Sequence, residues 1–325
     1  MRLRVLTASD IDALLPMRDA IQVNAGAYVD LSMGRVQMPQ RLALQTDDGV
    51  VLFMPALQRS SGHLGMKVVS VFPHNTTQHL PTIHALVLVI DPDTGVPQAL
   101  LNGTRLTALR TGAGAGAATQ VLAREDSRVM AMFGAGGQAM DQVEAVLAVR
   151  PVEEVRIYTP SGASAERLAR RLQERYPDRV FRRVADPGEA VRGADIITCA
   201  TTSSTPVFAP EDVSPGAHIN GVGSFTPSMR EVQIVGLPHL RVFVDSVEAA
   251  RAEAGDLIQA VAEGHLRWDD VIEIGQVLAG QQEGRRSRDE ITFFKSVGVA
   301  VQDAATAGAV VRRALDAHVG ELVEL

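Results

Sequence analysis

A glycine-rich turn near the middle of the chain has the residue types and spacing that suit phosphate binding. The segment Gly134–Ala139 has the pattern G-x-G-x-x-A and directly follows the apolar run Val129–Phe133. In a strand-turn-helix unit the first glycine makes the tight turn, the second lets backbone N–H groups approach a pyrophosphate, and the small last residue lets the helix pack on the strand. The phosphates then lie at a helix N-terminus, where unpaired N–H groups favour negative charge. The pattern predicts a dinucleotide site with contacts from Gly134, Gly136, Gly137, Gln138 and Ala139.

Three cations stand in segments that are otherwise apolar, small or turn-like. Arg41 opens a strand-like run, Lys67 lies within Met-Lys-Val-Val-Ser-Val, and Arg110 lies in a helix-like stretch of small residues. A charged group that becomes buried needs a partner. One interpretation is a salt bridge to an acid such as Asp30 or Glu231. The other is a clamp that holds a substrate carboxylate beside a nicotinamide, with Lys67 and Arg110 as the catalytic candidates.

Lysine is rare in this chain. Only two of the 31 lysines and arginines are lysines, Lys67 and Lys295. A general preference for arginine on the surface is one explanation, and a lysine retained as a compact cation that can give up its proton is another. In the second interpretation, the positive charges of Arg41 and Arg110 in the same clamp lower the pKa of Lys67 and favour proton exchange.

The type of dinucleotide depends on the tip of the next strand. An NAD-binding unit usually carries Asp or Glu there, about 20 residues after the glycines, to bond the ribose 2′-OH. Here the strand ends Tyr158-Thr159-Pro160-Ser161, without an acid. Thr159 and Ser161 can donate hydrogen bonds to a 2′-phosphate, although Thr-Pro-Ser-Gly also fits an ordinary turn. The missing acid at the tip favours NADP over NAD. The tip has no arginine that would strengthen this preference.

Composition and motifs narrow the class of protein. The 325 residues suffice for two domains, and 46% hydrophobic with 21% charged residues is ordinary for a globular protein. A net charge of −7 argues against nucleic acid or an anionic membrane as the main partner. No signal-peptide run opens the chain, and the single Cys199, expected to be buried, fits a reducing cytoplasm. Because H-E-x-x-H, C-x-x-C and G-x-S-x-G are all missing, we expect neither a metal nor these kinds of nucleophile.

The first hundred residues predict a helix followed by a mixed or antiparallel sheet. Ser9 can cap the helix, and short turns such as Asp91–Gly95 separate the strand-like runs that follow it. These runs are Arg41–Gln45, Val50–Leu57, Met66–Phe72, Ile83–Ile90 and Gln98–Leu101. A long helix from Thr104 then leads into the second part of the chain.

Strands and helices alternate between residues 128 and 247, which predicts right-handed crossovers and a parallel sheet. Ligands of such sheets lie beyond the carboxyl ends of the strands. We therefore expect further cofactor contacts from residues at two strand ends, namely Ala200, Thr201, Thr202, Val222 and Gly223. The predicted fold is α/β, with a Rossmann doubly wound parallel sheet at residues 119–291 and an α+β domain at residues 1–118. The remainder, Ile291–Leu325, is helical in pattern.

Three segments together resemble the ornithine cyclodeaminase/μ-crystallin family. They are Leu106–Ala113 (L-T-A-L-R-T-G-A), Phe133–Ala139 (F-G-A-G-G-Q-A) and Gly221–Glu231 (G-V-G-S-F-T-P-S-M-R-E). The resemblance covers nearly the whole chain. It implies an NAD(P)-binding Rossmann domain and a homodimer, in which residues 1–118, completed by residues 292–325, handle substrate and dimerisation.

The resemblance also implies roles for single residues. Arg41, Lys67 and Arg110 match the family's carboxylate-binding arginines and lysine. Thr82 matches a residue at the nicotinamide end of the cofactor, and Lys295-Ser296-Val297-Gly298 matches a segment that closes over it. Thr82, Arg110, Ser296 and Gly298 are therefore added to the expected cofactor contacts.

Two departures from the family pattern shape the expected chemistry. Where ornithine cyclodeaminases carry a catalytic aspartate, this chain has Phe225, which cannot bind an ammonium or accept a proton but can pack on an apolar ring. The resemblance is thus to the ketimine reductase-like branch, which reduces small cyclic imino acids. Where NADP-binding relatives carry an arginine at the dinucleotide tip, this chain has Pro160.

Three functions remain under consideration. The first is an NAD(P)H-dependent reductase of a cyclic 2-imino acid of the pyrroline-2-carboxylate or piperideine-2-carboxylate type, or an amino-acid dehydrogenase such as alanine dehydrogenase. The second is ornithine cyclodeaminase, which converts ornithine to proline and ammonia. The third is a protein that binds NADP(H) or another ligand without catalysis, and the retained Arg41, Lys67 and Arg110 argue against it.

Overall fold

The computed structural model describes residues 2–325, which divide into two compact units. Unit 1 contains the chain up to Arg110 and the segment Val299–Leu325, and unit 2 contains Thr111–Gly298. The sequence had placed these boundaries after residues 118 and 291. The first boundary lies within the continuous helix α3 (Gly103–Leu122), where no break in the helix marks it.

Unit 1 is built on a mixed sheet in the order β16-β1-β7-β6-β5-β4-β2, with β3 paired to β4. All its pairs are antiparallel except β1 with β7. The strands are β1 (Arg2–Leu6), β2 (Val36–Gln37), β3 (Leu42–Gln45), β4 (Val50–Gln58), β5 (His63–Val71), β6 (Ile83–Ile90), β7 (Pro97–Asn102) and β16 (Glu321–Glu324). Its helices are α1 (Ala8–Leu14), α2 (Met17–Ser32), the 3-10 turn η1 (Pro73–Gln78) and α10 (Ala300–Ala317).

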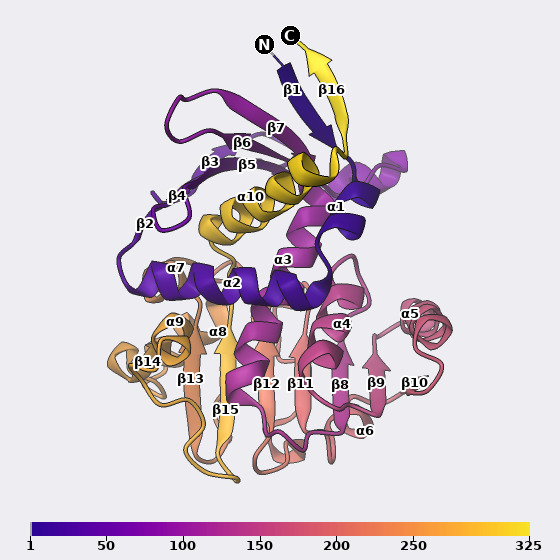
Figure 1. The fold of residues 1–325 in the computed structure, drawn as a ribbon. Helices are drawn as coiled ribbons and strands as arrows, with labels where there is room; N and C mark the ends of the chain where they lie inside the picture. The colour runs from indigo at the N-terminus through magenta and orange to yellow at the C-terminus, as the bar shows by residue number, and fades with distance from the viewer. Residues whose placement is uncertain (1) are drawn as a thin grey trace. The chain divides into compact units, whose positions relative to one another are not determined.

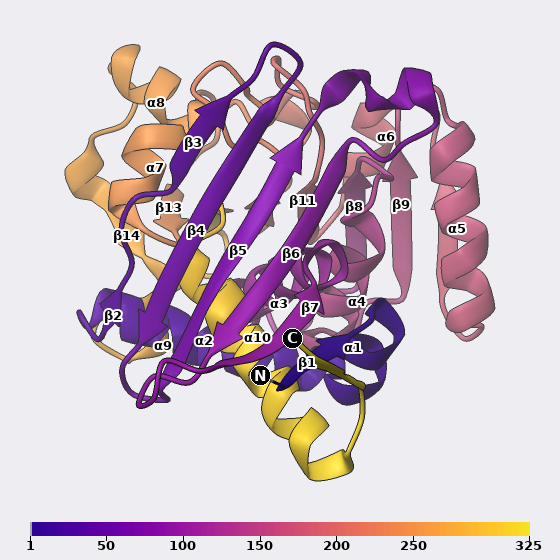
Figure 2. The same cartoon turned by 90° about the horizontal axis from the view of Figure 1, so that it is seen from above.

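The two faces of this sheet differ. Met54, Lys67 and Val87 are cross-strand neighbours on β4, β5 and β6, and all three are buried on the side against which α10 packs. The next row, Phe53–Val68–Leu86, points to the opposite side because strand side chains alternate. Figure 2 shows β4, β5 and β6 with α10 behind them. Lys67 is thus a charged residue placed in the core-facing row.

The sequence predicted the five strands from β3 to β7 and the long helix α3, and the structure confirms them. The predicted cap of α1 was wrong, because Thr7 and not Ser9 caps this helix. The Thr7 hydroxyl accepts a hydrogen bond from the backbone N–H of Asp10, and the Asp10 carboxylate accepts one from the backbone N–H of Thr7. The edge pair β1 and β16 was missed, since each is short and lies at one end of the chain.

Unit 2 is a doubly wound sheet in which all strands are parallel, in the order β10-β9-β8-β11-β12-β15-β13-β14 (Figure 1). The strands are β8 (Val129–Phe133), β9 (Glu154–Tyr158), β10 (Val180–Arg183), β11 (Ile196–Cys199), β12 (His218–Gly221), β13 (Leu240–Val244), β14 (Val271–Glu273) and β15 (Ile291–Lys295). The helices are α4 (Ala139–Val149), α5 (Ala163–Arg175), α6 (Pro187–Val191), α7 (Val247–Glu253), α8 (Gly255–Ala262) and α9 (Ile274–Leu278), with 3-10 turns η2 (Pro210–Asp212) and η3 (Trp268–Asp270).

This parallel sheet confirms the predicted fold class and the alternation of strands and helices between residues 128 and 247. One expectation failed: the predicted helical segment from Ile291 begins with a strand, because Ile291–Lys295 lies in the sheet between β12 and β13. Its five residues are all buried, and a short run without alternation is easily taken for part of a helix. Cys199 is buried at the end of β11, as expected.

Within residues 2–325, none of the helices has the length and apolar character needed to cross a membrane. The same residues contain no group of histidine, cysteine or acidic side chains arranged to hold a metal ion.

Candidate functional site

A buried ion-pair cluster in unit 1 joins two of the three predicted substrate-binding cations. Nζ of Lys67 lies 2.8 Å from Oδ2 of Asp303, and Nε of Arg110 lies 3.0 Å from Oδ1 of the same carboxylate. Lys67 comes from β5, Arg110 from α3 and Asp303 from α10, so one strand and two helices contribute one charge each. The Lys67 and Asp303 side chains are 2% and 1% exposed, which makes this a core pair rather than a surface pair.

Amide and hydroxyl groups surround the cluster. Gln302 accepts a hydrogen bond from Nη1 of Arg110 through Oε1, at 3.0 Å. Its Nε2 donates to Oδ1 of Asn24 at 3.1 Å and to the hydroxyl of Tyr28 at 2.9 Å, both on α2. Asn24 in turn donates to Thr306. Buried polar groups that are fully paired in this way hold one geometry, which fixes the Arg110 guanidinium.

The cluster carries excess positive charge. Burial lowers the pKa of Lys67 to about 8, and the neighbouring Arg110 and Arg41 guanidinium groups add to this effect, while Asp303 opposes it. The Asp303 carboxylate is thus shared by two buried cations, Lys67 and Arg110. An anionic ligand such as a carboxylate would relieve the imbalance.

The partners considered from the sequence were the wrong acids. Asp30 binds Arg35, Gln58 and Ser60 instead, and Glu231 binds backbone amides of unit 2. Asp303 takes their place. It was detectable by the same signal that identified Arg110, namely a charge within a run of small apolar residues.

The glycine-rich turn of unit 2 has the geometry of a phosphate cradle. Gly134 has φ of +93°, and a Cβ added to it would collide with the carbonyl oxygen of Ala200. A Cβ on Gly136 or Gly137 would meet nothing within 4 Å, so the backbone there borders open space. Ala139 is fully buried where α4 begins against the sheet. These residues fit a dinucleotide. Gly134 makes the tight turn, Gly136 leaves room for a phosphate to approach the backbone, and Ala139 lets the helix pack closely on the sheet.

A buried carboxylate shapes the two loops that follow β11 and β12. Oε1 of Glu231 accepts from the backbone N–H of Thr201 at 2.6 Å, and Oε2 accepts from those of Gly223 and Ser224 at 2.7 and 2.9 Å. Burial raises the pKa of Glu231, and the nearby Lys295 ammonium opposes that shift. Two of the predicted cofactor contacts, Thr201 and Gly223, are therefore positioned by one side chain.

Lys295 completes this network. Its Nζ lies 3.1 Å from Oδ2 of Asp256 and donates to the carbonyl oxygen of Ser224 at 2.5 Å. Asp256 also accepts from the backbone N–H of Glu231 at 2.6 Å. Lys295 and Asp256 are both fully buried. Both lysines of the chain are thus buried partners of an aspartate.

The segment after β15 is held by Asp245. Its Oδ2 accepts from the hydroxyl of Ser296 at 2.8 Å and from the backbone N–H groups of Val297 and Gly298 at 3.0 and 2.8 Å. Burial raises the pKa of Asp245, and these hydrogen bonds oppose the shift. The Ser296 hydroxyl, which sequence reasoning assigned to the cofactor, donates to this carboxylate.

Other predicted residues lie on loops. Phe225 follows β12 and is 39% exposed, which is high for a large apolar side chain. Thr159 is buried at the end of β9, where its hydroxyl oxygen accepts from the backbone N–H of Gly162 at 3.2 Å, as in an ordinary turn. Thr82 is half-buried after η1, and its carbonyl oxygen accepts from the N–H of Phe72.

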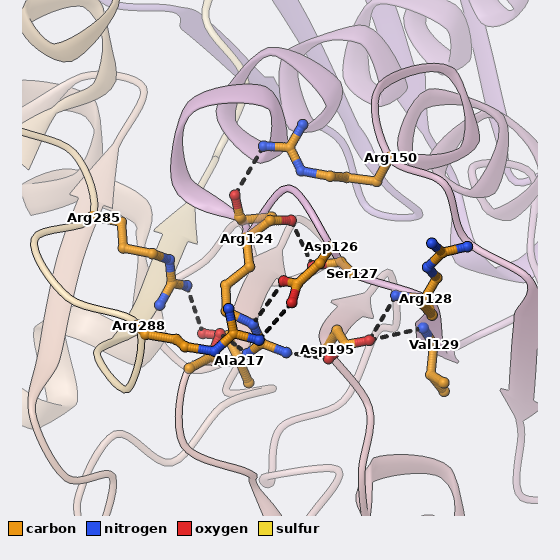
Figure 3. Close-up of polar contacts among 12 residues, drawn as sticks. Arg124, Asp126, Ser127, Arg128, Val129, Arg150, Asp195, Ala217, Arg285 and Arg288 are labelled. Carbon is orange, nitrogen blue, oxygen red and sulfur yellow. Dashed lines mark hydrogen bonds and ion pairs between the residues drawn. The ribbon is translucent and has the colours of Figure 1, made fainter.

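A second group of arginines lies at the amino ends of the strands of unit 2 (Figure 3). Arg124 pairs with Asp195, whose other oxygen accepts from the backbone N–H groups of Arg128 and Val129. Arg150 donates to the carbonyl oxygens of Gln120 and Ala123, and Arg285 to that of Leu122, all in the last turn of α3 or just beyond it. These contacts satisfy backbone carbonyl oxygens that have no hydrogen-bond partner within α3 at its C-terminal end. We therefore assign this cluster a structural role.

Sequence reasoning missed most of the side chains that position the site. In unit 1, Asp303 and Gln302 bind the predicted cations. In unit 2, Asp245 and Asp256 bind backbone N–H groups of the loops. Glu231 was predicted only as a possible salt-bridge partner. Their contacts are between residues far apart in the chain. No local pattern could pair them.

Comparisons with known proteins agree on one family. The family model described as ornithine cyclodeaminase/mu-crystallin family matches residues 1–318. A Delta(1)-pyrroline-2-carboxylate reductase of Bacillus cereus is 39% identical, over 98% of this chain and 99% of its own length. The solved Delta(1)-pyrroline-2-carboxylate reductase of Thermococcus litoralis, in complex with NADH and L-proline, is 36% identical with a TM-score of 0.92, over 98% of this chain and 99% of the other. An archaeal alanine dehydrogenase dimer with bound NAD is 34% identical with a TM-score of 0.93, over 100% of both chains.

Proposed function

Because this chain belongs to the ornithine cyclodeaminase/mu-crystallin family, we propose that it is an NAD(P)H-dependent reductase of a small cyclic 2-imino acid. The expected substrates are of the pyrroline-2-carboxylate or piperideine-2-carboxylate type, and the product is the L-amino acid. The observation that carries the proposal is the cluster of Lys67, Arg110 and Asp303, a buried site with excess positive charge. The similar Bacillus and Thermococcus reductases support the same substrate class.

In this proposal the cations of unit 1 bind the substrate carboxylate. Arg110 offers a planar fork of donors, fixed by Gln302 and Asp303, and such a fork suits bidentate carboxylate binding. The charge of Arg41 also lowers the pKa of Lys67, and the proposal assigns Arg41 to the same anion. Phe225 offers an apolar surface to a carbon ring rather than a partner for an ammonium group.

Reduction of an imine needs one hydride at carbon and one proton at nitrogen. When bound, a reduced nicotinamide supplies the hydride. The glycine-rich turn of unit 2 and the loops held by Glu231 would hold that cofactor, with Gly134, Gly136 and Gly223 giving close backbone approach. Lys67, with its pKa near 8, is suited to deliver the proton to the imine nitrogen and to recover one from solvent.

The experiment that tests this proposal is a spectrophotometric screen. The purified protein is given pyrroline-2-carboxylate, piperideine-2-carboxylate, or pyruvate plus ammonia, each with NADPH and with NADH in parallel. Oxidation of the cofactor with a cyclic imine supports the proposal, provided that Lys67→Met abolishes it. Activity with pyruvate and ammonia alone would favour the second candidate, alanine dehydrogenase, to which this chain is similar along its whole length.

For the cofactor, we propose a preference for NADP over NAD. The tip after β9 has no carboxylate to bond a ribose 2′-OH, so a 2′-phosphate meets no repulsion there. The similar structures bind NADH or NAD, so the preference rests on this chain's own residues.

We also propose that the protein is a homodimer that pairs through the open face of the sheet of unit 1. Leu42, Leu44 and Leu86 on that face are 58%, 52% and 52% exposed. Leu42, Phe53, Val68 and Leu86 form one apolar row across four strands. An apolar surface of this extent is typical of a protein interface, and the similar alanine dehydrogenase is a dimer.

Sedimentation of two variants tests the assembly. Leu86→Lys places a charge in the apolar row and should convert the dimer to a monomer. Leu315→Lys, at a leucine 48% exposed on α10, is the matched control and should stay dimeric. A monomeric unmodified protein, or dissociation of both variants alike, would contradict the proposed interface.

A further inference from the structure

The end of β10 brings an arginine to the tip that follows β9. In a dinucleotide-binding unit this tip lies next to the ribose of the adenosine half, where NAD and NADP differ by a 2′-phosphate. The two strands are parallel, and Arg183 is in register with Ile157, one residue before the end of β9. Both strands therefore end at the same edge of the sheet, although Arg183 lies 20 or more residues beyond the tip in sequence.

The Arg183 guanidinium rests on the glycine of that tip. A Cβ added to Gly162 would lie 2.6 Å from Cζ and 2.7 Å from Nη2 of Arg183, and closer still to Nε. Gly162 also has φ of +70°, a conformation that favours glycine. The close approach of backbone and guanidinium thus places a cation at Thr159–Gly162, where no local sequence pattern predicted one.

Arg183 differs from its neighbours in having no carboxylate partner among residues 2–325. Arg182 pairs with Glu154 and Glu189, both at 2.7 Å, and Arg156 pairs with Glu154 at 3.1 Å. Arg183 is exposed, and neither Glu154 nor Glu189 binds it. Its charge is therefore available to a ligand.

We propose that Arg183 binds the 2′-phosphate of NADP(H) and sets the cofactor preference of this chain. The guanidinium supplies the bidentate, charged donors that phosphate favours. Ser161, exposed on the same tip, adds a hydroxyl donor. This inference rests on the proposed dinucleotide site in unit 2.

A different role for Arg183 would be stacking on the adenine ring. The two roles differ in what they predict, because NADH and NADPH share the adenine and differ in the phosphate. A phosphate contact strengthens binding of NADPH alone. A stacking contact strengthens binding of both nucleotides equally.

Calorimetric titration separates these outcomes without relying on catalysis. The probes are NADPH, NADH, 2′,5′-ADP and 5′-AMP, titrated into the unmodified protein, Arg183→Ala and the control Arg182→Ala. We expect Arg183→Ala to weaken binding of NADPH and 2′,5′-ADP by roughly tenfold to a hundredfold, as a lost charged hydrogen bond does, with NADH and 5′-AMP changed less than about twofold. Arg182→Ala should preserve the preference for NADPH.

Three results would overturn the inference. They are equal weakening of NADPH and NADH by Arg183→Ala, an unchanged preference for NADPH in that variant, and equal affinity of the unmodified protein for both nucleotides. Failure of the proposed function is distinguishable from these. A protein that binds NADPH tightly but reduces no imino acid contradicts the substrate proposal alone, whereas one that binds neither nucleotide contradicts the cofactor site itself.

Discussion

Asp303 holds Lys67 by a 2.8 Å ion pair between Oδ2 and Nζ, with both side chains buried. The other oxygen of the same carboxylate binds Arg110. Asp303 is therefore a positioning residue for two proposed substrate-binding cations. It also keeps the pKa of Lys67 from falling further, since its charge favours the ammonium form.

We predict that Asp303→Asn destabilises the protein and shifts its activity to lower pH. The change leaves two buried cations without their anion, and losing one partner of a buried pair costs roughly 3 to 5 kcal/mol of unfolding free energy. The pKa of Lys67 should drop because its stabilising charge is gone. The control is Asp19→Asn, which breaks the exposed pair with Arg313 and should cost about 0 to 1 kcal/mol. Denaturant unfolding and a pH–rate profile measure both effects, and equal unfolding midpoints for the two variants would contradict the prediction.

We predict that kcat/KM for the imino acid falls as the pH rises above about 8, the pKa to which burial lowers Lys67. Above that pH the free enzyme loses both the proton and one cation of the site. Lys67→Arg should lack this decline, because guanidinium stays charged, but should be slower by roughly a factor of 100 or more through loss of the proton donor. A decline that persists unchanged in Lys67→Arg would assign it to another group.

The same pKa predicts how stability depends on pH. The folded pKa of Lys67, about 8, lies below its ordinary value of 10.5, so the unfolded chain binds more protons between these values. Lys67 should therefore make the unfolding free energy rise as the pH increases from about 8 towards 10.5. Comparing denaturant unfolding of the unmodified protein with Lys67→Met across this range isolates the contribution, and parallel curves would count against it.

We predict that ornithine is not deaminated. Phe225 has no carboxylate to orient or deprotonate an amine, and its ring suits an apolar surface instead. Incubation with ornithine and catalytic NAD, without a reductant, should release no ammonia above a Lys67→Met control. Ammonia release that depends on Lys67 would restore ornithine cyclodeamination as the activity.

We predict that Glu231→Gln weakens cofactor binding and lowers stability. The carboxylate accepts three backbone N–H groups, whereas a glutamine amide presents its own N–H₂ to at least one of them. The loops at Thr201 and Gly223 should lose their fixed geometry, at a cost of roughly 1 to 3 kcal/mol. Glu263→Gln, which alters a partly exposed pair with Arg230, is the control. Titration with NADPH and thermal unfolding provide the readouts, and unchanged affinity would show that the loops do not depend on this side chain.

The sequence predicted those parts of the fold that local patterns encode. Strands such as Val129–Phe133 are marked by apolar runs and by the glycines after them, and the structure confirms them. β15 was misassigned because its five residues are buried on both faces and show no alternation. The cap of α1 was displaced by two residues because Thr7 and Ser9 are chemically alike, and only the geometry distinguishes them.

For the site too, the sequence predicted residues that a local pattern marks and missed contacts that depend on packing. Lys67 and Arg110 stood out because a charge in an apolar segment is costly, and the structure brings both to one carboxylate. The identity of that carboxylate depended on packing between α10 and β5, which no single segment encodes. Arg183 was missed for the same reason, since it reaches Gly162 from the neighbouring strand.

Both lysines of this chain are buried against aspartates, and none of its other side chains carries a primary amine. Apart from the α-amino group, the folded protein should therefore react slowly with reagents that acylate primary amines. Labelling of Lys295, which is fully buried, requires local opening of the Rossmann unit, and labelling of Lys67 requires opening of the sheet and α10. Amine acylation followed by mass spectrometry would thus report the opening of each unit through a single built-in site.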